Sequence, residues 1–402
     1  MTKNIVSLSE LNDISKYKRD NLMDDNLIKK VLTFKSGNFV FSAKYNLSEL
    51  RNLLYEAELL YTTIADLPIL PDLSARLEEE LIRRSIFSTA ALEGNPLKEE
   101  EVGEIIDKKD DVQKESEAKQ AIVNLGNAYT YIKTIRPAAI PLKLTEDFIK
   151  EAHKTITLNL KNTDNLPGIY RNHIVKVGDN EHGGVYTPPK CRADIENLMQ
   201  GFVEWINCKE VMELNSLIRA PLAHYHLGLI HPFGNGNGRT IRIVEAMLLG
   251  TSNIKYVPTM LSNYYYRKMD EYYLSFSLAR QNPEHDVTVF LKFMLEGVID
   301  SLKEIKERVI FDIRLLAMRD YYNFLKRSKI LTQRQYDLIS ILLEGGGVKT
   351  VSLKDLFHVS PYNTLYRNVG ERTARRDLHK LLEQRILSQE NDSYKLNIKI
   401  LG

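Results

Sequence analysis

The most distinctive stretch of this 402-residue chain is HPFGNGNGRTIR, which occupies positions 231–242. Glycines alternate with asparagines immediately before a helical pattern, so backbone N–H groups can converge with no Cβ atom in the way. The N-terminus of the helix that follows adds the positive end of its dipole to this concavity. The spacing therefore predicts a site for an anion such as a phosphate.

Charged side chains of the same stretch supply the other parts of a site for phosphoryl or nucleotidyl transfer. Arg239 and Arg242 lie three residues apart on the first helical turn, so both guanidinium groups can face one ligand. His231 precedes the loop and can take up a proton near neutral pH. A plain Gly-Asn turn with a structural histidine stays open as the alternative, because the spacing matches neither a P-loop nor a dinucleotide-binding fingerprint.

Helical periodicity dominates the chain on both sides of this loop. We expect helices over about 47–60, 73–92, 99–107, 113–135, 215–230, 239–250, 262–280 and 286–326. Residues 167–189 alternate apolar and polar side chains and include a glycine-rich turn, which predicts a β-hairpin. We therefore divide the chain into an irregular or strand-containing lead-in (1–46), a helical region (47–140), a core (141–325) and a separate C-terminal unit (330–402).

The C-terminal unit resembles a winged helix-turn-helix in the order of its expected elements. Helices are expected at 333–343, 353–357 and 371–384, followed by strands at 386–389 and 394–398. The third helix carries basic residues that can meet DNA, and acidic residues that oppose them: Arg372, Arg375, Arg376 and Lys380 against Glu371, Asp377 and Glu383. Residues 331–402 hold 11 Lys and Arg and 8 Asp and Glu, so DNA binding and protein contact are equally open.

Composition indicates buried cores and no obligatory polyanionic partner. Hydrophobic residues make up 43% of the chain and charged residues 27%, and the net charge is +2. Cys191 and Cys208 do not make a disulfide framework in a chain of this length. The sequence contains neither a signal-peptide pattern nor an apolar run of membrane-spanning length, so we expect a cytoplasmic protein that does not engage a membrane.

Residues 231–242 closely resemble the signature of the Fic family, HPFx(D/E)GNGRxxR, and the resemblance extends over most of residues 47–300. It implies a mainly α fold, the Fic helical bundle with a β-hairpin flap, to which this chain adds a small C-terminal winged helix domain. It also implies the activity of a protein adenylyltransferase, which transfers AMP from ATP to the hydroxyl group of a Tyr, Thr or Ser side chain in a protein.

The resemblance implies a role for each residue of the loop. His231 would deprotonate the attacking hydroxyl, and Phe233 would face the core and anchor the loop. The nucleotide would be held by Asn235, Gly236, Asn237, Gly238, Arg239 and Arg242. Residues 236–238 would hold the α-phosphate, with the Asn237 side chain as an additional donor, while Arg239 and Arg242 would hold the β- and γ-phosphates.

Two further stretches occur in the order that the family shows. The hairpin tract looks like the family's flap, in which Val175, Lys176, Val177 and Gly178 would pair with a segment of the target protein. Residues 89–95 are similar to the family's inhibitory motif, (S/T)xxxE(G/N), which implies that Glu93 binds Arg242. A carboxylate in the last turn of a helix is disfavoured by the helix dipole, so Glu93 needs a cation nearby.

One position departs from the family pattern. The acidic residue that binds Mg²⁺ in the family is Asn235 here, and an amide oxygen lacks the charge that this hard cation favours. Weak Mg²⁺ affinity, another divalent ion, a different phosphate-linked donor group and an inactive descendant all stay open. The alternative function is a nucleotide-sensing, DNA-binding regulator with little or no transferase activity. Self-modification and a homodimer are further options for the partners.

Overall fold

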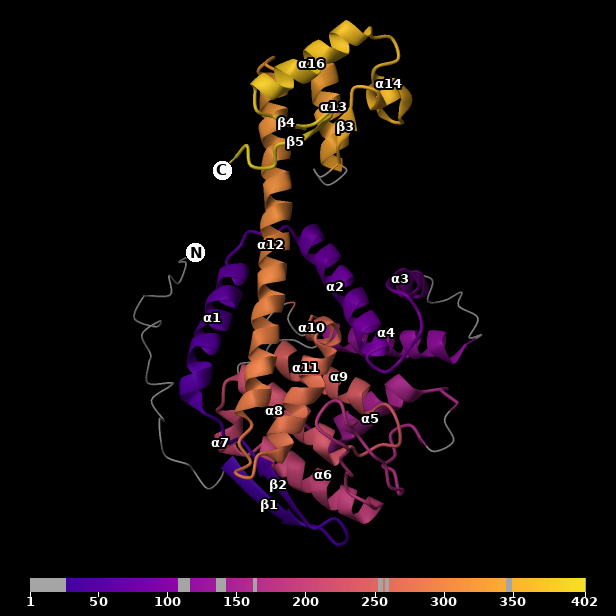
Figure 1. The fold of residues 1–402 in the computed structure, drawn as a ribbon, viewed down its shortest axis with the longest axis vertical. Coiled ribbons are helices and arrows are strands. Elements are labelled where there is room, and N and C mark those ends of the chain that lie inside the picture. The colour runs from indigo at the N-terminus through magenta and orange to yellow at the C-terminus, as the bar shows by residue number, and fades with distance from the viewer. Residues whose placement is uncertain are drawn as a thin grey trace. The chain divides into compact units, whose positions relative to one another are not determined.

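The computed structural model describes residues 27–107, 116–134, 142–161, 165–251, 256, 260–344 and 349–401, so the expected lead-in before residue 27 lies outside the described residues. Contacts divide the chain into two compact units. One unit comprises Met1–Asp66 and Ser74–Glu304, and the other comprises Leu67–Leu73 and Ile305–Gly402. Figure 1 shows the helices and strands that make up each unit.

The first unit is mainly helical, which confirms the predicted fold class. Its helices are α1 (Leu47–Ala65), α2 (Pro71–Ala91), α3 (Glu99–Asp107), α4 (Glu117–Thr134), α5 (Glu146–Thr157), α6 (Arg192–Ile206), α7 (Lys209–Met212), α8 (Ser216–Ile230), α9 (Asn237–Gly250), α10 (Leu261–Arg267), α11 (Met269–Gln281) and the first part of α12 (Thr288–Arg327). Asparagine or threonine caps three of these helices by accepting a backbone N–H bond: Asn46 before α1, Thr145 before α5 and Asn215 before α8.

Helix α8 lies at the centre of this unit, and every residue from Leu217 to Ile230 is buried. Helix α9 packs against α8 and also contacts α4 and α5. A shared apolar core joins α2, α4, α5 and α9 through Ile86, Ile122, Ile156 and Ile243. This core fixes the end of α2 beside the start of α9, where the loop 231–238 lies.

The described part of the lead-in forms an antiparallel strand pair. Strand β1 (Ile28–Leu32) pairs with β2 (Asn38–Ser42) in the register Ile28↔Ser42 to Leu32↔Asn38. Phe41 of β2 is fully buried and stacks on Trp205 of α6 with ring centroids 5.7 Å apart. The strand pair therefore covers one face of α6.

Two details differ from the predicted elements. The helix expected over 262–280 is divided into α10 and α11 at Lys268, which leaves helical geometry with φ −121° and ψ 42°. The flap contains a single antiparallel bridge, Val177↔Tyr186, in place of regular strands. Glycines with positive φ, such as Gly178 and Gly183, surround this bridge and interrupt the extended conformation that a longer ladder needs.

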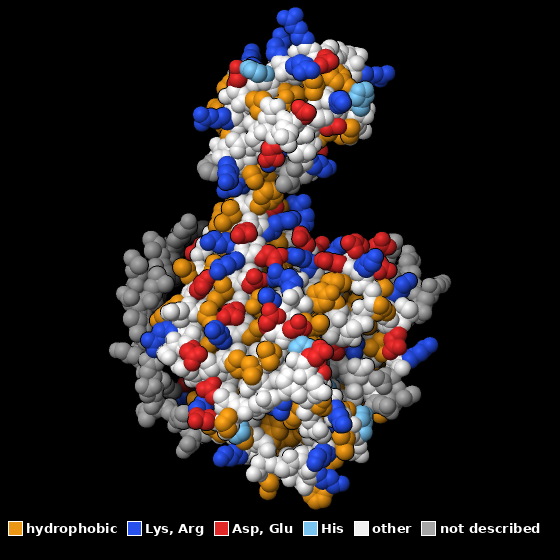
Figure 2. Space-filling view, viewed as in Figure 1, with side chains coloured by type: hydrophobic (Ala, Val, Ile, Leu, Met, Phe, Trp, Pro, Cys, Tyr) orange, Lys and Arg blue, Asp and Glu red, His pale blue; other side chains and the backbone are white. Residues whose placement is uncertain are grey.

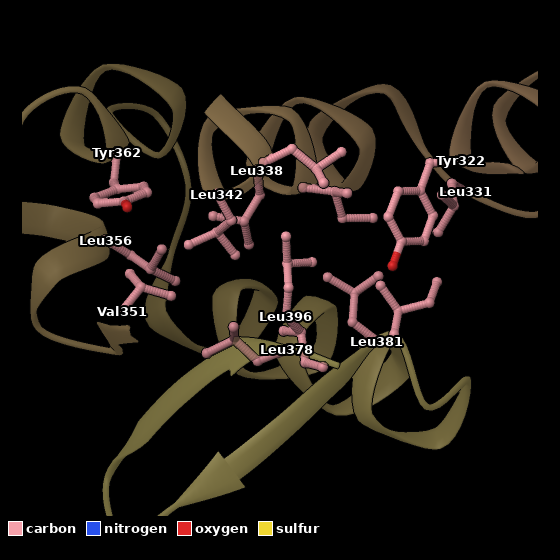
Figure 3. Packing of buried hydrophobic residues seen from close by; sticks show 14 of the residues in the cluster. Tyr322, Leu331, Leu338, Leu342, Val351, Leu356, Tyr362, Leu378, Leu381 and Leu396 are labelled. Carbon is pink, nitrogen blue, oxygen red and sulfur yellow. The ribbon is translucent and has the colours of Figure 1, made fainter. Parts of the chain in front are cut away.

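The second unit combines short helices with a small sheet. It contains α13 (Gln333–Glu344), β3 (Val351–Ser352), α14 (Asp355–His358), α15 (Tyr362–Leu365), α16 (Glu371–Glu383), β4 (Leu387–Glu390) and β5 (Ser393–Leu396). The sheet order is β3-β5-β4, with both pairs antiparallel. Figure 3 shows Leu338, Leu342, Leu378 and Leu381 meeting in the core of this unit. The expected helices and the two final strands are present, while β3 and α15 were not anticipated.

The surface carries both charges. On the face of the first unit in Figure 2, Lys and Arg side chains are interspersed with Asp and Glu. Cys191 and Cys208 are both free thiols. Along the described residues, no helix combines the length and the apolar character needed to cross a bilayer.

Candidate active site

His231 ends helix α8 in the left-handed conformation, with φ 48° and ψ 58°. Buried Arg171 holds this turn from the root of the flap: its Nε donates to the His231 carbonyl at 2.8 Å, and its backbone N–H donates to the Pro232 carbonyl at 3.0 Å. Arg171 therefore fixes the backbone that presents His231. The signature at 231–242 does not contain Arg171 and did not predict this role.

The imidazole of His231 is held in its neutral form. Burial lowers its pKa to about 4, and the charge of Arg171 acts in the same direction. The charge of Glu93 opposes this shift, and so does a weaker backbone contact with Gly228. A neutral imidazole carries its proton on one ring nitrogen only, so the second is unprotonated at neutral pH.

The side chain of Asn237 closes the loop on itself. Its Oδ1 accepts the Phe233 N–H at 3.0 Å, and its Nδ2 donates to the Phe233 carbonyl at 2.8 Å. The amide predicted to donate to a phosphate is thus already bonded within the loop. The first turn of α9 has no capping side chain, so the N–H groups of residues 237–239 are the donors left for an anion.

The side chains of Asn235 and Arg239 contact each other at the loop. Oδ1 of Asn235 accepts the Gly236 N–H at 2.6 Å and Nη2 of Arg239 at 3.1 Å. Asn235 is exposed, whereas Arg239 is buried, with 7% of its surface accessible. The amide oxygen therefore stands beside the uncapped helix N-terminus and next to a guanidinium group.

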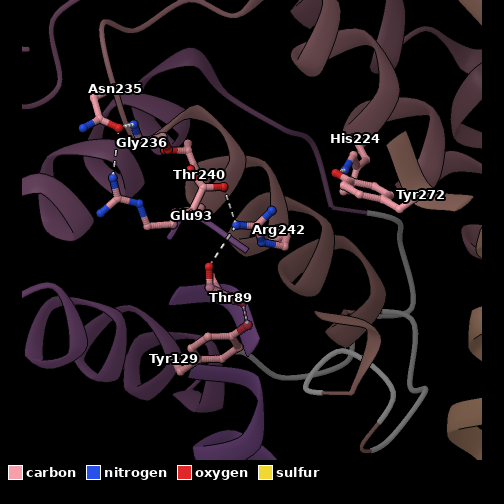
Figure 4. Close-up of polar contacts among 10 residues, drawn as sticks. Thr89, Glu93, Tyr129, His224, Asn235, Gly236, Thr240, Arg242 and Tyr272 are labelled. Atoms are coloured by element: carbon pink, nitrogen blue, oxygen red, sulfur yellow. Dashed lines mark hydrogen bonds and ion pairs between the residues drawn. The ribbon is translucent and has the colours of Figure 1, made fainter. Parts of the chain in front are cut away.

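Glu93 is in direct contact with Arg242 (Figure 4). Nη2 of Arg242 donates to Oε1 of Glu93 at 2.7 Å and to the Thr89 carbonyl at 3.1 Å. Arg242 is 3% exposed and Glu93 26% exposed. Burial raises the pKa of the Glu93 carboxyl, but the charges of Arg242 and Arg239 outweigh it, so the net pKa is lowered and the carboxylate is charged. Glu93 lies two residues beyond the end of α2 rather than within its last turn.

Gly238 makes room for this contact. A Cβ atom at this position would clash with Oε1 of Glu93 and lie 3.1 Å from Nη1 of Arg242. The carboxylate therefore lies directly over the first turn of α9, where the helix dipole favours an anion. In this structure Glu93 occupies the space that the loop pattern predicts for a phosphate.

The four flap residues predicted to bind a target form one side of the bridge. Val177 exchanges both backbone hydrogen bonds with Tyr186, at 2.9 and 2.8 Å. In an antiparallel pair the neighbour of a paired residue points its backbone groups the other way, so those of Lys176 face the open edge, whereas Gly178, with φ +87°, leaves the extended conformation. Val175 is half-buried, and Lys176 and Gly178 are exposed.

His153 of α5 is a site residue that sequence reasoning missed. It is fully buried, stacks on Phe233 with ring centroids 3.6 Å apart, and bonds to the Asn235 carbonyl at 2.9 Å. The only sequence signal for it is a histidine on the apolar face of an amphipathic helix, which is usually a packing residue.

His224 and His226 of α8 are both 1% exposed and make packing contacts. Nδ1 of His224 lies 3.1 Å from Glu245, and its Nε2 lies 2.7 Å from the Tyr272 hydroxyl. Among the residues that the structure describes, no three His, Cys, Asp or Glu side chains gather as a metal site.

Comparison with known proteins identifies the domain that carries this site. The model of the Fic/DOC family matches residues 143–249. Proteins named protein adenylyltransferase Fic from Drosophila erecta and Drosophila yakuba are 27% and 28% identical over 222 and 223 residues, which is 55% of this chain. The chain spans about two fifths of the length of these relatives, 41% in both cases.

Solved structures show the same fold. A Fic family protein from Desulfovibrio desulfuricans G20 superposes with a TM-score of 0.54 and 21% identity, covering 87% of this chain and 95% of that one. Fic-1 of C. elegans superposes with a TM-score of 0.50 and 20% identity, covering 66% of this chain and 73% of that one. Residues 143–249, which carry this site, therefore form a Fic domain.

Proposed function

We propose that this protein transfers AMP from ATP to the hydroxyl group of a Tyr, Thr or Ser side chain, and that Glu93 restrains the reaction. The observation that carries the proposal is the uncapped N-terminus of α9 between a neutral histidine and two arginines. Its free N–H groups suit an anion, and His231 suits the removal of a proton beside that anion. The names of the relatives from Drosophila support ATP as the substrate.

The proposed reaction is an in-line displacement at the α-phosphorus. The unprotonated nitrogen of His231 takes the hydroxyl proton as the hydroxyl oxygen bonds to the α-phosphorus. The bond between the α-phosphorus and the bridging oxygen breaks, and pyrophosphate leaves with the electron pair. The N–H groups of residues 237–239 stabilise the charge on the α-phosphate, and Arg239 and Arg242 stabilise the charge on pyrophosphate.

Incubation with ATP labelled at the α- or the γ-phosphate tests the proposal. We expect covalent label on protein from the α-position only, since the adenylate is retained and pyrophosphate is released. Label from the γ-position would indicate phosphate transfer instead. Nucleotide binding without covalent label would favour a nucleotide-sensing regulator.

The residues beside the loop do not fit a Mg²⁺ site of the usual kind. Mg²⁺ prefers at least one carboxylate beside the phosphates, whereas Asn235 offers a neutral oxygen that already accepts two hydrogen bonds. The nearby carboxylate, Glu93, is bonded to Arg242. No step of the proposed reaction is therefore assigned to the metal.

The substitution Asn235→Asp is expected to raise Mg²⁺-dependent AMP transfer. A carboxylate at this position would keep the contacts with Gly236 and Arg239 and add the charge that a hard cation favours. We expect the Mg²⁺ concentration for half-maximal transfer to fall on the order of tenfold, equivalent to ~1.4 kcal/mol. Asn165→Asp is the matched control, because Asn165 also bonds within the loop but through the Asn235 N–H. Equal metal dependence in wild type and Asn235→Asp would contradict the prediction.

The flap edge supports a protein as the acceptor. Backbone groups of Lys176 face away from Tyr186, so an extended segment can pair there without a specific side-chain sequence. We infer that a hydroxyl-bearing residue of such a segment is the one brought to His231.

The second unit has a feature that favours DNA as a further partner. Asp377, which the sequence suggested as a counterweight to the basic residues of α16, is buried and paired with Arg334 at 2.7 Å. Glu371 is paired with Arg375 on the same helix. The remaining cations Arg372, Arg376 and Lys380 are exposed at intervals of four residues, which places them along one face. We infer a winged helix whose α16 binds duplex DNA through this face.

Replacing Arg372, Arg376 and Lys380 together by alanine is expected to weaken duplex binding. Affinity falls as salt rises, and each phosphate contact that is lost makes the plot of log affinity against log salt less steep by about 1. We therefore expect the slope of the triple variant to be less negative by about 3. Arg375→Ala is the matched control, since Arg375 lies on the same helix but is paired with Glu371. Titration of a labelled duplex at several salt concentrations measures the slope. Unchanged affinity in the triple variant would leave protein contact as the role of this unit.

A further inference from the structure

His153 contacts the loop and the flap at the same time. The Gly168 N–H, at the root of the flap, donates to Nδ1 of His153 at 2.9 Å. Nε2 of His153 bonds to the Asn235 carbonyl at 2.9 Å. The ring lies parallel to that of Phe233, with an interplanar angle of 1°. Three separate contacts therefore hold this fully buried side chain in one orientation.

The contacts define the protonation state of the ring. A backbone N–H only donates, so Nδ1, which receives the Gly168 N–H, carries no proton. A carbonyl only accepts, so Nε2, which meets the Asn235 carbonyl, carries the proton. Burial lowers the pKa of His153 to about 4, in agreement with a neutral ring. His153 is thus a neutral donor aimed at one loop carbonyl.

That carbonyl determines where a neighbouring N–H points. The carbonyl of Asn235 and the N–H of Gly236 belong to one trans peptide group, so they point in opposite directions. With the carbonyl turned inward to His153, the Gly236 N–H faces outward, where it meets Oδ1 of Asn235. Gly236 has φ +79°. Because glycine has no Cβ atom, the peptide group before it can rotate at little steric cost.

We propose that His153 is a positioning residue that prevents rotation of the peptide group 235–236. Without its Nε2–H donor, the Asn235 carbonyl oxygen can turn outward and place a partial negative charge beside the N–H groups of residues 237–239 that would hold the α-phosphate. The consequence for transfer rests on the proposed function, whereas the orientation of the peptide group does not.

Two substitutions separate the contacts of His153. His153→Gln keeps an amide donor near the position of Nε2 and so keeps the bond to Asn235. His153→Asn keeps an acceptor near the position of Nδ1, for Gly168, and cannot reach Asn235. Both variants are made in the Glu93→Gly background, and ATP affinity, kcat and KM for AMP transfer, melting temperature and a crystal structure are compared.

We expect His153→Asn to lower kcat/KM for transfer by about 10- to 100-fold, with weaker ATP binding and a rotated peptide group 235–236. His153→Gln is expected to stay within about threefold of the parent at a similar melting temperature. Equal losses in both variants, with the peptide group unrotated, would show that His153 is only a packing residue and overturn the proposal.

Two further measurements keep the test decisive. If the parent transfers no AMP, the proposed function fails, but ATP affinity and the orientation of the peptide group in the two variants still decide the role of His153. If His153→Asn does not fold, the ¹⁵N histidine spectrum of the wild-type protein decides: Nε2–H with bare Nδ1 supports the proposal, and the opposite tautomer overturns it.

Discussion

The substitution His231→Ala is expected to lower AMP transfer by about 10²- to 10⁴-fold while ATP still binds. In the proposed reaction the imidazole removes the proton of the attacking hydroxyl, whereas the side chains of Asn237 and Arg239 hold the loop. The folded site should therefore lose its base and keep its anion-binding groups. Covalent adenylate on protein and pyrophosphate release report the reaction, and calorimetry with ATP reports binding.

The pH dependence of the wild-type protein offers an independent check on His231. The pKa near 4 means that the ring stays neutral at neutral pH and becomes protonated only as the pH falls towards 4. Transfer that depends on this base should therefore be level near neutrality and decline in acid. His379→Ala is the control, because His379 lies on α16 with 72% of its side chain exposed. Its removal should leave the pH profile of transfer unchanged. A His231→Ala protein that transfers AMP at the wild-type rate would remove His231 from the reaction.

The second large effect is expected from Glu93→Gly, which should increase AMP transfer. The Glu93 carboxylate lies over Gly238 and binds Arg242, so the γ-phosphate and the carboxylate compete for one guanidinium group. A coupling of 1–3 kcal/mol between such sites corresponds to an increase of about 5- to 150-fold. Initial rates of adenylate incorporation at several ATP concentrations measure the increase.

Two variants serve as controls for Glu93→Gly. Glu93→Gln keeps the size of the side chain and removes its charge, so an intermediate rate is expected if the ion pair is the restraint. Glu79→Ala removes an exposed carboxylate from α2, the helix that precedes Glu93, and should leave the rate unchanged. Equal rates in wild type and Glu93→Gly would mean that the contact with Arg242 does not restrain the site.

Local patterns in the sequence predict most of the helical framework. Apolar spacing locates α1, α2, α8 and α9, and the change from Gly-Asn repeats to helical periodicity marks the start of α9 near residue 237. The pairing of Glu93 with Arg242 was expected from the inhibitory motif, and the structure places the two side chains in contact.

The remaining features depend on contacts between distant segments. His153 precedes Asn235 by 82 positions, and nothing in α5 alone indicates which carbonyl its ring will meet. Arg171 lies within the tract 167–189 that the sequence predicts as a hairpin, but its bond to the His231 carbonyl depends on how the root of the flap packs against α8. The role of Asn237 also could not be read from its position, because an amide at a helix start can bond either to a ligand or to its own loop, as it does here.

Gly238 bears on how the restrained state could be lost by mutation. Any larger residue at position 238 would push Glu93 aside. It would also crowd Arg242 and the backbone N–H groups at the start of α9. Escape from restraint through position 238 would therefore damage the enzyme that it releases. Under the proposed restraint, a substitution of Glu93 itself removes the carboxylate without adding atoms at the start of α9.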